Sequence, residues 1–597
     1  MPKRTTVSWD LSDLFDSTTD PRIDESLDRI LARAREFAGR YRGKIDSDDL
    51  TPETLLSAIT EYESIAQEMA KTSGYATLVF AADTGKFEHG ALLQHVQERQ
   101  TEISLELIFF ELELMAAKAE VVDRAASDPR LANYRHFIHA SRLFREHRLP
   151  EGEEKILEEK ANTGGRAWER LFEETVSAIE FEVTVEGEKR VLTEPEVLAL
   201  LRDPNRETRK AAAEGLTAGL LRSGRLITFI FNTLVLDKSI DDRLRRYEYP
   251  EQARNISNEL DAETVETVIS TCVESYPLVA RYYSIKRDIL GYDKLMHYDR
   301  YAPLFEAKKT YEFEEAKKIV LDSFGSFSET VRDAAAEFFE KRWIDAAPRK
   351  GKRGGAFCLY VTPDLHPYVL LSYLNRKDDI MTLGHELGHG VHAYLARAQS
   401  YFNFSSALPV TELASTFGEM LVFESLVRES DLDEKLALYA EKIEETFATV
   451  FRQAAMYRFE QELHRARREL GELTSDQIGE MWQRSIQAMF GDSVEMGDEH
   501  RHWWMYVNHF VQSPFYVYAY SFGELLVMAL YSMYRREGAQ FVPKYLELLK
   551  AGGSLSPEDL LSRVGANIRD PEFWRGGMSV LEQLVADFER LTQQRGR

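Results

Sequence analysis

Two histidines and a glutamate lie within five consecutive residues, His385-Glu-Leu-Gly-His389. Histidines four positions apart project from one face of an α-helix, about one turn from each other, so both imidazoles can bind one metal ion. Glu386 lies beside that metal position and is our candidate for the group that accepts a proton from water. This pattern is typical of zinc hydrolases that cleave amide bonds.

The residues around the motif favour a metal site over an ordinary helix surface that happens to carry two histidines. Apolar residues recur at helical spacing and form one stripe, which excludes the histidines: Ile380, Leu383, Leu387, Val391 and Leu395. Gly384 and Gly388 lie inside the same predicted helix, where each glycine costs about 1 kcal/mol relative to alanine. We therefore expect another part of the chain to approach the helix backbone closely at these glycines.

A hydrolytic zinc site usually has three protein ligands, so one more must come from elsewhere in the chain. A longer histidine pattern would place a histidine at residue 395, but that position holds Leu395. The alternative is a carboxylate on a second helix, and we predict that this helix begins after Pro409 and supplies Glu412 as the third metal ligand. Ser415 and Glu419 share its face and are expected to orient the ligands.

Residues 350–373 interrupt the helical pattern just before the metal motif. The segment Lys350–Gly355 is basic and rich in glycine, and Ala356–Val361 and Tyr368–Tyr373 favour strands. An edge strand beside the metal could bind a peptide substrate through backbone hydrogen bonds. We expect one of these strands to be that edge; the alternative is a small structural hairpin.

A third group of residues, between His509 and Tyr520, could stabilise the oxyanion that forms when a carbonyl group is attacked. Histidine N–H and tyrosine O–H groups can donate the hydrogen bonds that this requires. If the segment is helical, His509, Tyr516 and Tyr520 lie on one face and Tyr518 points elsewhere. Pro514 disturbs such a helix, and an aromatic run can also belong to a hydrophobic core. We take His509, Tyr516 and Tyr520 as further candidate catalytic residues.

Together these motifs resemble the thimet oligopeptidase family of zinc metallopeptidases, and within it the bacterial oligoendopeptidase F branch. The shared segments span nearly the whole chain: Trp9–Leu14, Gly351–Cys358, His385–His392, Glu412–Glu419, His509–Gly523 and Ser554–Asp559. The resemblance implies a zincin-like catalytic domain, with two helical lobes around a deep substrate cleft and a small β-sheet near the zinc site. It also implies one Zn²⁺ per chain and short peptides as substrates.

Helical periodicity in most segments predicts a mainly α fold. We expect residues 1–192 to form an N-terminal helical lobe, with an oligoendopeptidase F N-terminal region at about 110–185, and residues 193–597 to form the catalytic domain. A β-hairpin is predicted just before this boundary, with strands at Phe181–Val185 and Arg190–Leu192.

The composition indicates in which compartment the protein acts and which classes of partner it does not bind. The net charge of −25 opposes binding to nucleic acid or to an anionic membrane. Only Cys272 and Cys358 are present, which favours a reducing compartment, and neither a secretory signal nor a membrane-spanning apolar run is recognisable. We expect a cytoplasmic protein; the oligomeric state is left open, and a monomer is compatible with the sequence.

The function that we predict is a zinc metalloendopeptidase that hydrolyses internal bonds of short oligopeptides during intracellular peptide turnover. The alternatives are a zinc exopeptidase, of the carboxypeptidase or dipeptidase type, and a non-catalytic peptide-binding protein. The presence of Glu386 together with all three ligands argues against the non-catalytic alternative. Two histidines and a carboxylate can also hold cobalt or manganese.

Overall fold

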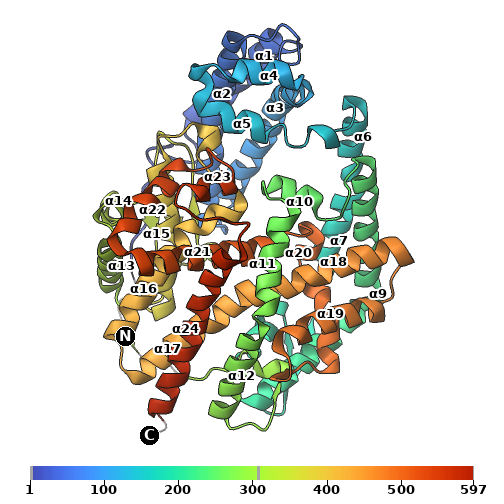
Figure 1. Ribbon diagram of the computed structural model, residues 1–597. Helices are drawn as coiled ribbons and strands as arrows, with labels where there is room; N and C mark the ends of the chain where they lie inside the picture. The colour runs from blue at the N-terminus through green and yellow to red at the C-terminus, as the bar shows by residue number, and fades with distance from the viewer. Residues whose placement is uncertain (1–4, 306–308, 596–597) are drawn as a thin grey trace. The chain divides into compact units, whose positions relative to one another are not determined.

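The structure is a computed structural model that describes residues 5–305 and 309–595 (Figure 1). Helices dominate it, and the β-structure of the described residues is confined to three small sheets. The expected mainly α fold is therefore confirmed. The chain divides into two compact units, and each unit is assembled from three separate segments of the sequence.

The first unit is drawn from residues 1–145, 308–429 and 533–567. Its helices are α1 (Pro21–Tyr41), α2 (Pro52–Ala82), α3 (Phe87–Ala116), α4 (Ala119–Ala126), η1 (Pro129–Tyr134), α5 (Arg135–Ala140), α13 (Phe313–Phe327), α14 (Glu329–Glu340), α15 (Lys377–Ala396), η4 (Tyr401–Asn403), η5 (Leu408–Leu413), α16 (Ser415–Glu429), η8 (Gly538–Gln540), α22 (Phe541–Ala551) and α23 (Pro557–Ser562).

Capping residues fix the starts of the first two helices. The side chains of Asp20 and Thr51 each accept a hydrogen bond from a backbone N–H of the first turn of α1 and α2, and each is followed by proline. The apolar faces of α1, α2 and α3 form one core, which also includes Tyr368 and Leu370 from a small sheet. The N-terminal helices therefore support the segment that leads into the metal motif.

That sheet has three strands, β4 (Ile344–Asp345), β5 (Phe357–Leu359) and β6 (Tyr368–Leu370). Their order is β4-β6-β5, with β5 antiparallel and β4 parallel to β6. Two of these strands match the expected ones, although both are shorter than the predicted ranges. Strand β4 was not predicted, because a strand of two residues is too short to show alternation.

The second unit is drawn from residues 146–307, 430–532 and 568–597. Its elements are α6 (Glu151–Ala161), α7 (Gly165–Ser177), β1 (Phe181–Val185), β2 (Glu188–Leu192), α8 (Glu194–Leu200), α9 (Arg206–Leu244), α10 (Gln252–Ser257), α11 (Ala262–Glu274), α12 (Tyr276–Leu290), β3 (Leu295–Met296), η3 (His297–Asp299), α17 (Leu432–Phe447), η6 (Ala448–Arg452), α18 (Gln453–Leu470), α19 (Ser475–Phe490), β7 (Val494–Glu495), η7 (Asp498–Tyr506), α20 (His509–Gln512) and α24 (Pro571–Arg595). Helix α21 (Tyr518–Glu537) starts in this unit, and the short η2 (Arg145–His147) lies at its beginning.

The predicted β-hairpin is confirmed, since β1 and β2 pair antiparallel on either side of Glu186 and Gly187. Helix α9 packs on this hairpin so closely that a Cβ atom at Gly219 would lie 2.4 Å from the ring of Phe181. Among the described residues, α9 is also the one helix that is long and apolar enough to cross a membrane. This is weak evidence for a membrane span, because core helices of globular proteins have the same length and composition.

The domain boundary between residues 192 and 193 stays a prediction. It divides the chain into two continuous parts, whereas neither compact unit is continuous in sequence.

Candidate functional site

The metal motif lies on helix α15, as its spacing predicts. Residues Ile380, Leu383, Leu387 and Val391 of the apolar stripe are buried. The rings of His385 and His389 lie on another face of the helix, with their centroids 5.0 Å apart. The stripe holds the helix in the core of the first unit, and the two imidazoles are left to bind a ligand together.

The glycines of α15 mark the place where another segment crosses it. A Cβ atom at Gly388 would lie 2.3 Å from the carbonyl oxygen of Ala414 and 2.6 Å from the Cα of Ser415. At Gly384 the nearest atom would be a methyl group of Val422, at 2.9 Å. The expected close approach is therefore confirmed. It is tightest at Gly388, where the neighbours are backbone atoms.

The crossing segment is η5 followed by α16, and this corrects one detail of the prediction. We expected Glu412 on a helix that begins after Pro409. Glu412 instead lies in the 3₁₀ turn η5, and the α-helix begins only at Ser415. Proline at the start of η5 agrees with the expected helical start, but the backbone forms a tighter turn first.

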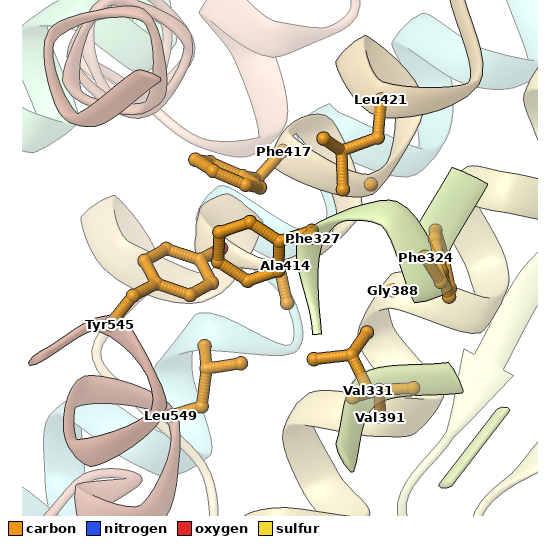
Figure 2. Close-up of a pocket in the computed structure, with 11 residues that line it drawn as sticks. Phe324, Phe327, Val331, Gly388, Val391, Ala414, Phe417, Leu421, Tyr545 and Leu549 are labelled. Atoms are coloured by element: carbon orange, nitrogen blue, oxygen red, sulfur yellow. The ribbon is translucent and has the colours of Figure 1, made fainter. Parts of the chain in front are cut away.

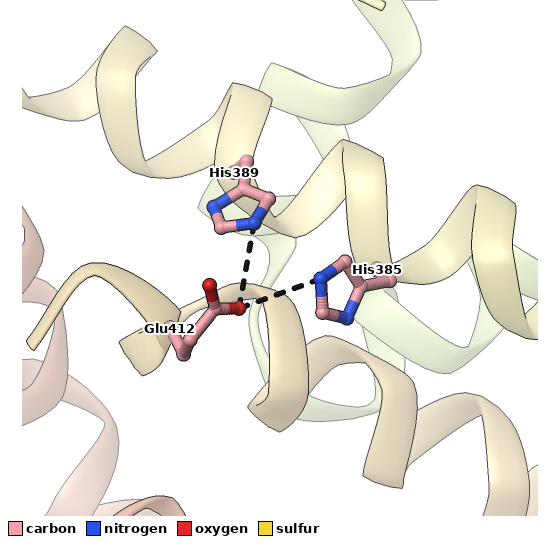
Figure 3. Close-up of side chains that lie close together, drawn as sticks. All are labelled: His385, His389 and Glu412. Carbon is pink, nitrogen blue, oxygen red and sulfur yellow. Dashed lines mark ion pairs between the residues drawn. The ribbon is translucent and has the colours of Figure 1, made fainter. Parts of the chain in front are cut away.

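Glu412 reaches the two histidines from this turn (Figure 3). Its Oε2 atom lies 3.4 Å from Nε2 of His385 and 3.4 Å from Nε2 of His389. Ligand atoms about 2.0–2.1 Å from a tetrahedral zinc ion lie roughly 3.3–3.4 Å apart, so the observed separations fit zinc. The described residues contain no other group of three or more histidine, cysteine or acidic side chains close enough to hold a metal.

Two side chains of α16 contact these candidate ligands. The hydroxyl of Ser415 donates a hydrogen bond of 2.6 Å to Oε2 of Glu412. Oε2 of Glu419 lies 3.2 Å from Nδ1 of His385, and an Nδ1–H that donates to this carboxylate leaves Nε2 free for a metal. These contacts restrict the rotation of Glu412 and of the His385 ring.

The charges around His385 favour a cation at this place. Burial lowers the pKa of His385, but the hydrogen bond and the negative charge of Glu419, with smaller contributions from Glu412 and Glu386, raise it to about 9 overall. The same carboxylates would stabilise a bound metal ion, which carries more positive charge than an imidazolium.

Glu386 is held in a buried position next to the histidines. The residue is 7% exposed, and its Oε2 atom is buried with no hydrogen-bond partner among the described residues. Burial raises the pKa of Glu386 to about 7, with His385 lowering it and Glu412 raising it further. A carboxylate with a pKa close to neutrality is suited to accept and return a proton.

A small apolar cavity is lined in part by Gly388 and Val391 of α15 (Figure 2). Its volume is about 20 Å³, and aromatic and aliphatic side chains of α13, α16 and α22 line it, among them Phe324, Phe417 and Tyr545. This space is close to that of one water molecule, and its walls are apolar. The cavity is therefore a packing feature of the core and too small for a peptide.

The histidine and the tyrosines expected to act on the oxyanion lie in the second unit. They do not belong to one helix, because residues 513–517 separate α20 from α21. Even so, Nε2 of His509 is 3.2 Å from the hydroxyl of Tyr520, and the rings of Tyr516 and Tyr520 have centroids 5.2 Å apart. Tyr518 points elsewhere, as expected, and its buried hydroxyl accepts a hydrogen bond from Asn258.

Sequence reasoning missed two tyrosines that support the metal motif. The hydroxyl of Tyr360, just after β5, donates to the carbonyl oxygen of His389 at 3.0 Å, and that of Tyr545 donates to the carbonyl oxygen of Leu413 at 2.5 Å. Tyr360 belongs to the predicted strand Ala356–Val361, so its position next to the motif was a usable signal. Tyr545 lies 132 residues from its partner, and no local pattern points to it.

A helix with two histidines and a glutamate, completed by a carboxylate from a second segment, defines a metallopeptidase site on a mainly helical fold. Comparison with known families agrees with this class. The model of Peptidase family M3 matches residues 199–580, and that of Oligopeptidase F matches residues 113–181. The first match covers more than half of the chain, which therefore belongs to peptidase family M3 and is a metallo-oligopeptidase.

Individual relatives align along nearly the full chain. Oligopeptidase PepF of Bacillus subtilis (strain 168) is 27% identical over 99% of this chain and 88% of its own length. An oligoendopeptidase F homolog of Lactococcus lactis subsp. lactis (strain IL1403) is 26% identical over 98% of this chain and 97% of its own.

Solved structures share the fold. A structure from Chlamydophila abortus has a TM-score of 0.88 at 24% identity, covering 98% of both chains. Oligoendopeptidase-F from Enterococcus faecium has a TM-score of 0.73 at 22% identity, covering 96% of this chain and 99% of its own.

Proposed function

We propose that this protein is a zinc metalloendopeptidase that cleaves internal bonds of short oligopeptides. The observation that carries the proposal is the grouping of His385, His389 and Glu412, with buried Glu386 beside them. The names of the relatives from Lactococcus lactis and Enterococcus faecium, both oligoendopeptidase F, support cleavage of internal bonds.

In this proposal His385, His389 and Glu412 hold one zinc ion per chain. Their donor atoms are two neutral imidazole nitrogens and one carboxylate oxygen, a set that zinc commonly takes in hydrolytic sites. Zinc bound there supplies a Lewis acid that acidifies water and polarises a carbonyl oxygen. Ser415 and Glu419 keep Glu412 and His385 in place through the contacts described above.

Glu386 is the general base and then the general acid. It accepts a proton from the attacking water and passes it to the amine that leaves when the peptide bond breaks. Burial raises the pKa of Glu386 above its usual value, which favours uptake of the proton from water.

His509 with Tyr516 or Tyr520 stabilises the oxyanion of the tetrahedral intermediate through hydrogen bonds. Burial lowers the pKa of His509, and the nearby Arg452 lowers it further. His509 is therefore a neutral imidazole with one N–H. While its Nε2 shares a hydrogen bond with the hydroxyl of Tyr520, only one of the two groups has a hydrogen left to donate to the oxyanion.

Strand β5 holds the substrate backbone. It is an edge strand in the order β4-β6-β5, so one side of its backbone pairs with β6 and the other has no strand partner among the described residues. Contacts with α15 place β5 next to the metal helix. Addition of an extended peptide to such an edge needs no particular side chain, which suits an enzyme that accepts varied peptides.

We place the protein in the cytoplasm, acting on short peptides without nucleic acid or membrane partners, in line with its charge of −25 and two free cysteines. Residues 1–192 form the non-catalytic N-terminal lobe, and residues 193–597 form the catalytic domain.

The test is cleavage of an internally quenched peptide whose two termini are blocked, because an exopeptidase cannot start on it. We expect the parent enzyme to cleave it, a chelator to stop cleavage, and added zinc to restore it. Glu386→Gln should reduce kcat by about 10²–10⁴-fold while the zinc content stays at one per chain, since the ligands are intact.

Mass analysis of the fragments locates the cleaved bond. Hydrolysis that survives both the chelator and Glu386→Gln would contradict the mechanism. Cleavage of unblocked peptides only, one or two residues from an end, would favour an exopeptidase.

A further inference from the structure

A strained turn connects α20 and α21 in the second unit. Residues Ser513, Pro514, Phe515 and Tyr516 form a β-turn that is closed by a 3.0 Å hydrogen bond from the N–H of Tyr516 to the carbonyl oxygen of Ser513. Phe515, the third residue of the turn, has a φ of +60°. Proline in the second position and a positive φ in the third are features of a type II turn, whose third position normally holds glycine or asparagine.

Phenylalanine is an unusual residue for that position. Six described residues other than glycine have a positive φ, and Phe515 alone among them is aromatic. Its Cβ atom makes this backbone conformation unfavourable, at a cost that persists only when the surroundings hold the conformation in place.

Glu460 of α18 holds the backbone of this turn. Its Oε1 atom accepts a buried hydrogen bond of 2.8 Å from the N–H of Phe515. The phenyl ring is fully buried, with its centroid 4.7 Å from that of His464 and 6.0 Å from that of Tyr457, and both of these residues also belong to α18. Helix α18 therefore contacts both the backbone and the side chain of Phe515, and Lys238 of α9 lies over the same ring, 5.8 Å from its centroid.

A carboxyl group in this position is costly to maintain. Glu460 is 1% exposed, and its Oε2 atom has no hydrogen-bond partner among the described residues. Burial raises the pKa of Glu460 to about 8, against the bond from Phe515 and the charges of Arg254 and Lys238, while Glu251 raises it further. An apolar residue would avoid this cost but would leave the N–H of Phe515 without its acceptor.

The residues of the candidate oxyanion group lie on both sides of the turn. His509 starts α20 before it, Tyr516 closes it, and Tyr520 lies in the first turn of α21 after it. The 3.2 Å contact between His509 and Tyr520 joins two helices whose relative direction the turn determines.

We propose that Glu460 is a positioning residue for peptide hydrolysis: by holding Phe515 in its strained conformation, it sets His509, Tyr516 and Tyr520 in the geometry that the oxyanion requires. This inference rests on the proposed function, because it assumes that these three residues act on the substrate.

The test compares two substitutions of nearly equal size. Glu460→Leu removes the acceptor, and we expect kcat to fall by about 10–100-fold with KM little changed, since misplaced groups weaken transition-state binding first. Glu460→Gln keeps an oxygen for the N–H of Phe515, and its kcat should stay within about threefold of the parent. Equal kcat values for Glu460→Leu and the parent would overturn the proposal, and so would an equally large loss in Glu460→Gln.

The same substitution in a Phe515→Gly variant tests whether the strained backbone of Phe515 is what Glu460 supports. Phe515→Gly allows a positive φ without cost, so adding Glu460→Leu to it should reduce kcat by less than about threefold further. If Glu460→Leu lowers kcat by the same factor in the parent and in Phe515→Gly, Glu460 acts independently of the turn. If Glu460→Leu alone does not fold, folding of the double variant supports the proposal; failure of both variants to fold shows that Glu460 serves only core stability.

Tyr520→Phe separates this inference from the proposed function. A large loss of kcat in Tyr520→Phe with none in Glu460→Leu defeats the positioning role alone. If neither Tyr520→Phe nor His509→Ala lowers kcat, these residues do not act on the substrate, and the positioning role that depends on them is wrong as well.

Discussion

The two candidate groups of functional residues are built in different ways. The metal group lies on a regular helix, and one neighbouring segment that crosses at a glycine completes it. The oxyanion group lies around a turn that contains a strained phenylalanine, and a buried carboxyl group of another helix holds it. Helical periodicity alone places the first two metal ligands, whereas tertiary contacts set the geometry of His509 and the tyrosines.

Because the two groups are built differently, we expect substitutions to affect them at different kinds of position. Around the metal, substitutions at the positions where the two segments meet should have the largest effects, because the local sequence is enough to specify the helix. Around the oxyanion group, the hydroxyl that acts on the substrate should be sensitive, and so should the contacts that hold the turn.

Among the substitutions that compare the two groups, the largest effect is expected from Tyr520→Phe, with Tyr518→Phe as its matched control. Loss of one oxyanion donor costs about 10²–10³-fold in kcat, so Tyr520→Phe should show a loss in this range with zinc bound normally. Tyr518→Phe removes a buried hydrogen bond to Asn258 and should cost about 1 kcal/mol of stability, with kcat nearly unchanged. Steady-state kinetics and thermal unfolding of both variants check this; similar kinetic losses in the two would mean that the assignment of Tyr520 is wrong.

A smaller effect, on metal binding, is expected from Gly388→Ala. In a free helix alanine is more stable than glycine by about 1 kcal/mol. Here its Cβ would lie 2.3 Å from the carbonyl oxygen of Ala414, so the segment that carries Glu412 must move away. We expect the protein to lose stability and zinc affinity to fall by about 100-fold, measured by competition with a chromophoric chelator.

Gly384→Ala is the control for that substitution, because its nearest neighbour is a methyl group of Val422 that can shift. Its zinc affinity should stay much closer to that of the parent. A Gly388→Ala variant that is more stable than the parent and binds zinc normally would contradict the crossing geometry.

The smallest effect is expected from Ser415→Ala, which removes the 2.6 Å hydrogen bond to Glu412 but no ligand. Loss of such an orienting contact typically costs about 10–100-fold in metal affinity, and we expect the lower end, because Glu412 is also held by its own turn. Ser415→Thr keeps a hydroxyl and serves as the control. Unchanged zinc affinity in Ser415→Ala would show that η5 alone orients Glu412.

Much of the fold could be predicted because it follows from local patterns. The buried stripe of α15 and the hairpin of β1 and β2 both depend on residues close together in sequence. The strand β4 and the 3₁₀ turn that carries Glu412 could not be predicted. The first has only two residues, and in the second a tighter turn precedes the α-helix that Pro409 favours.

The sequence by itself determined that His385, Glu386 and His389 share a helix, that something must approach Gly388, and that Glu412 could complete a metal site. The helix repeat and the cost of helical glycines are properties of the chain alone. Only the tertiary structure decided how His509 meets Tyr520, which acid supports Phe515, and which tyrosines hold the backbone of the metal motif. These contacts join residues that are distant in sequence or separated by a turn, and their geometry depends on how whole helices pack.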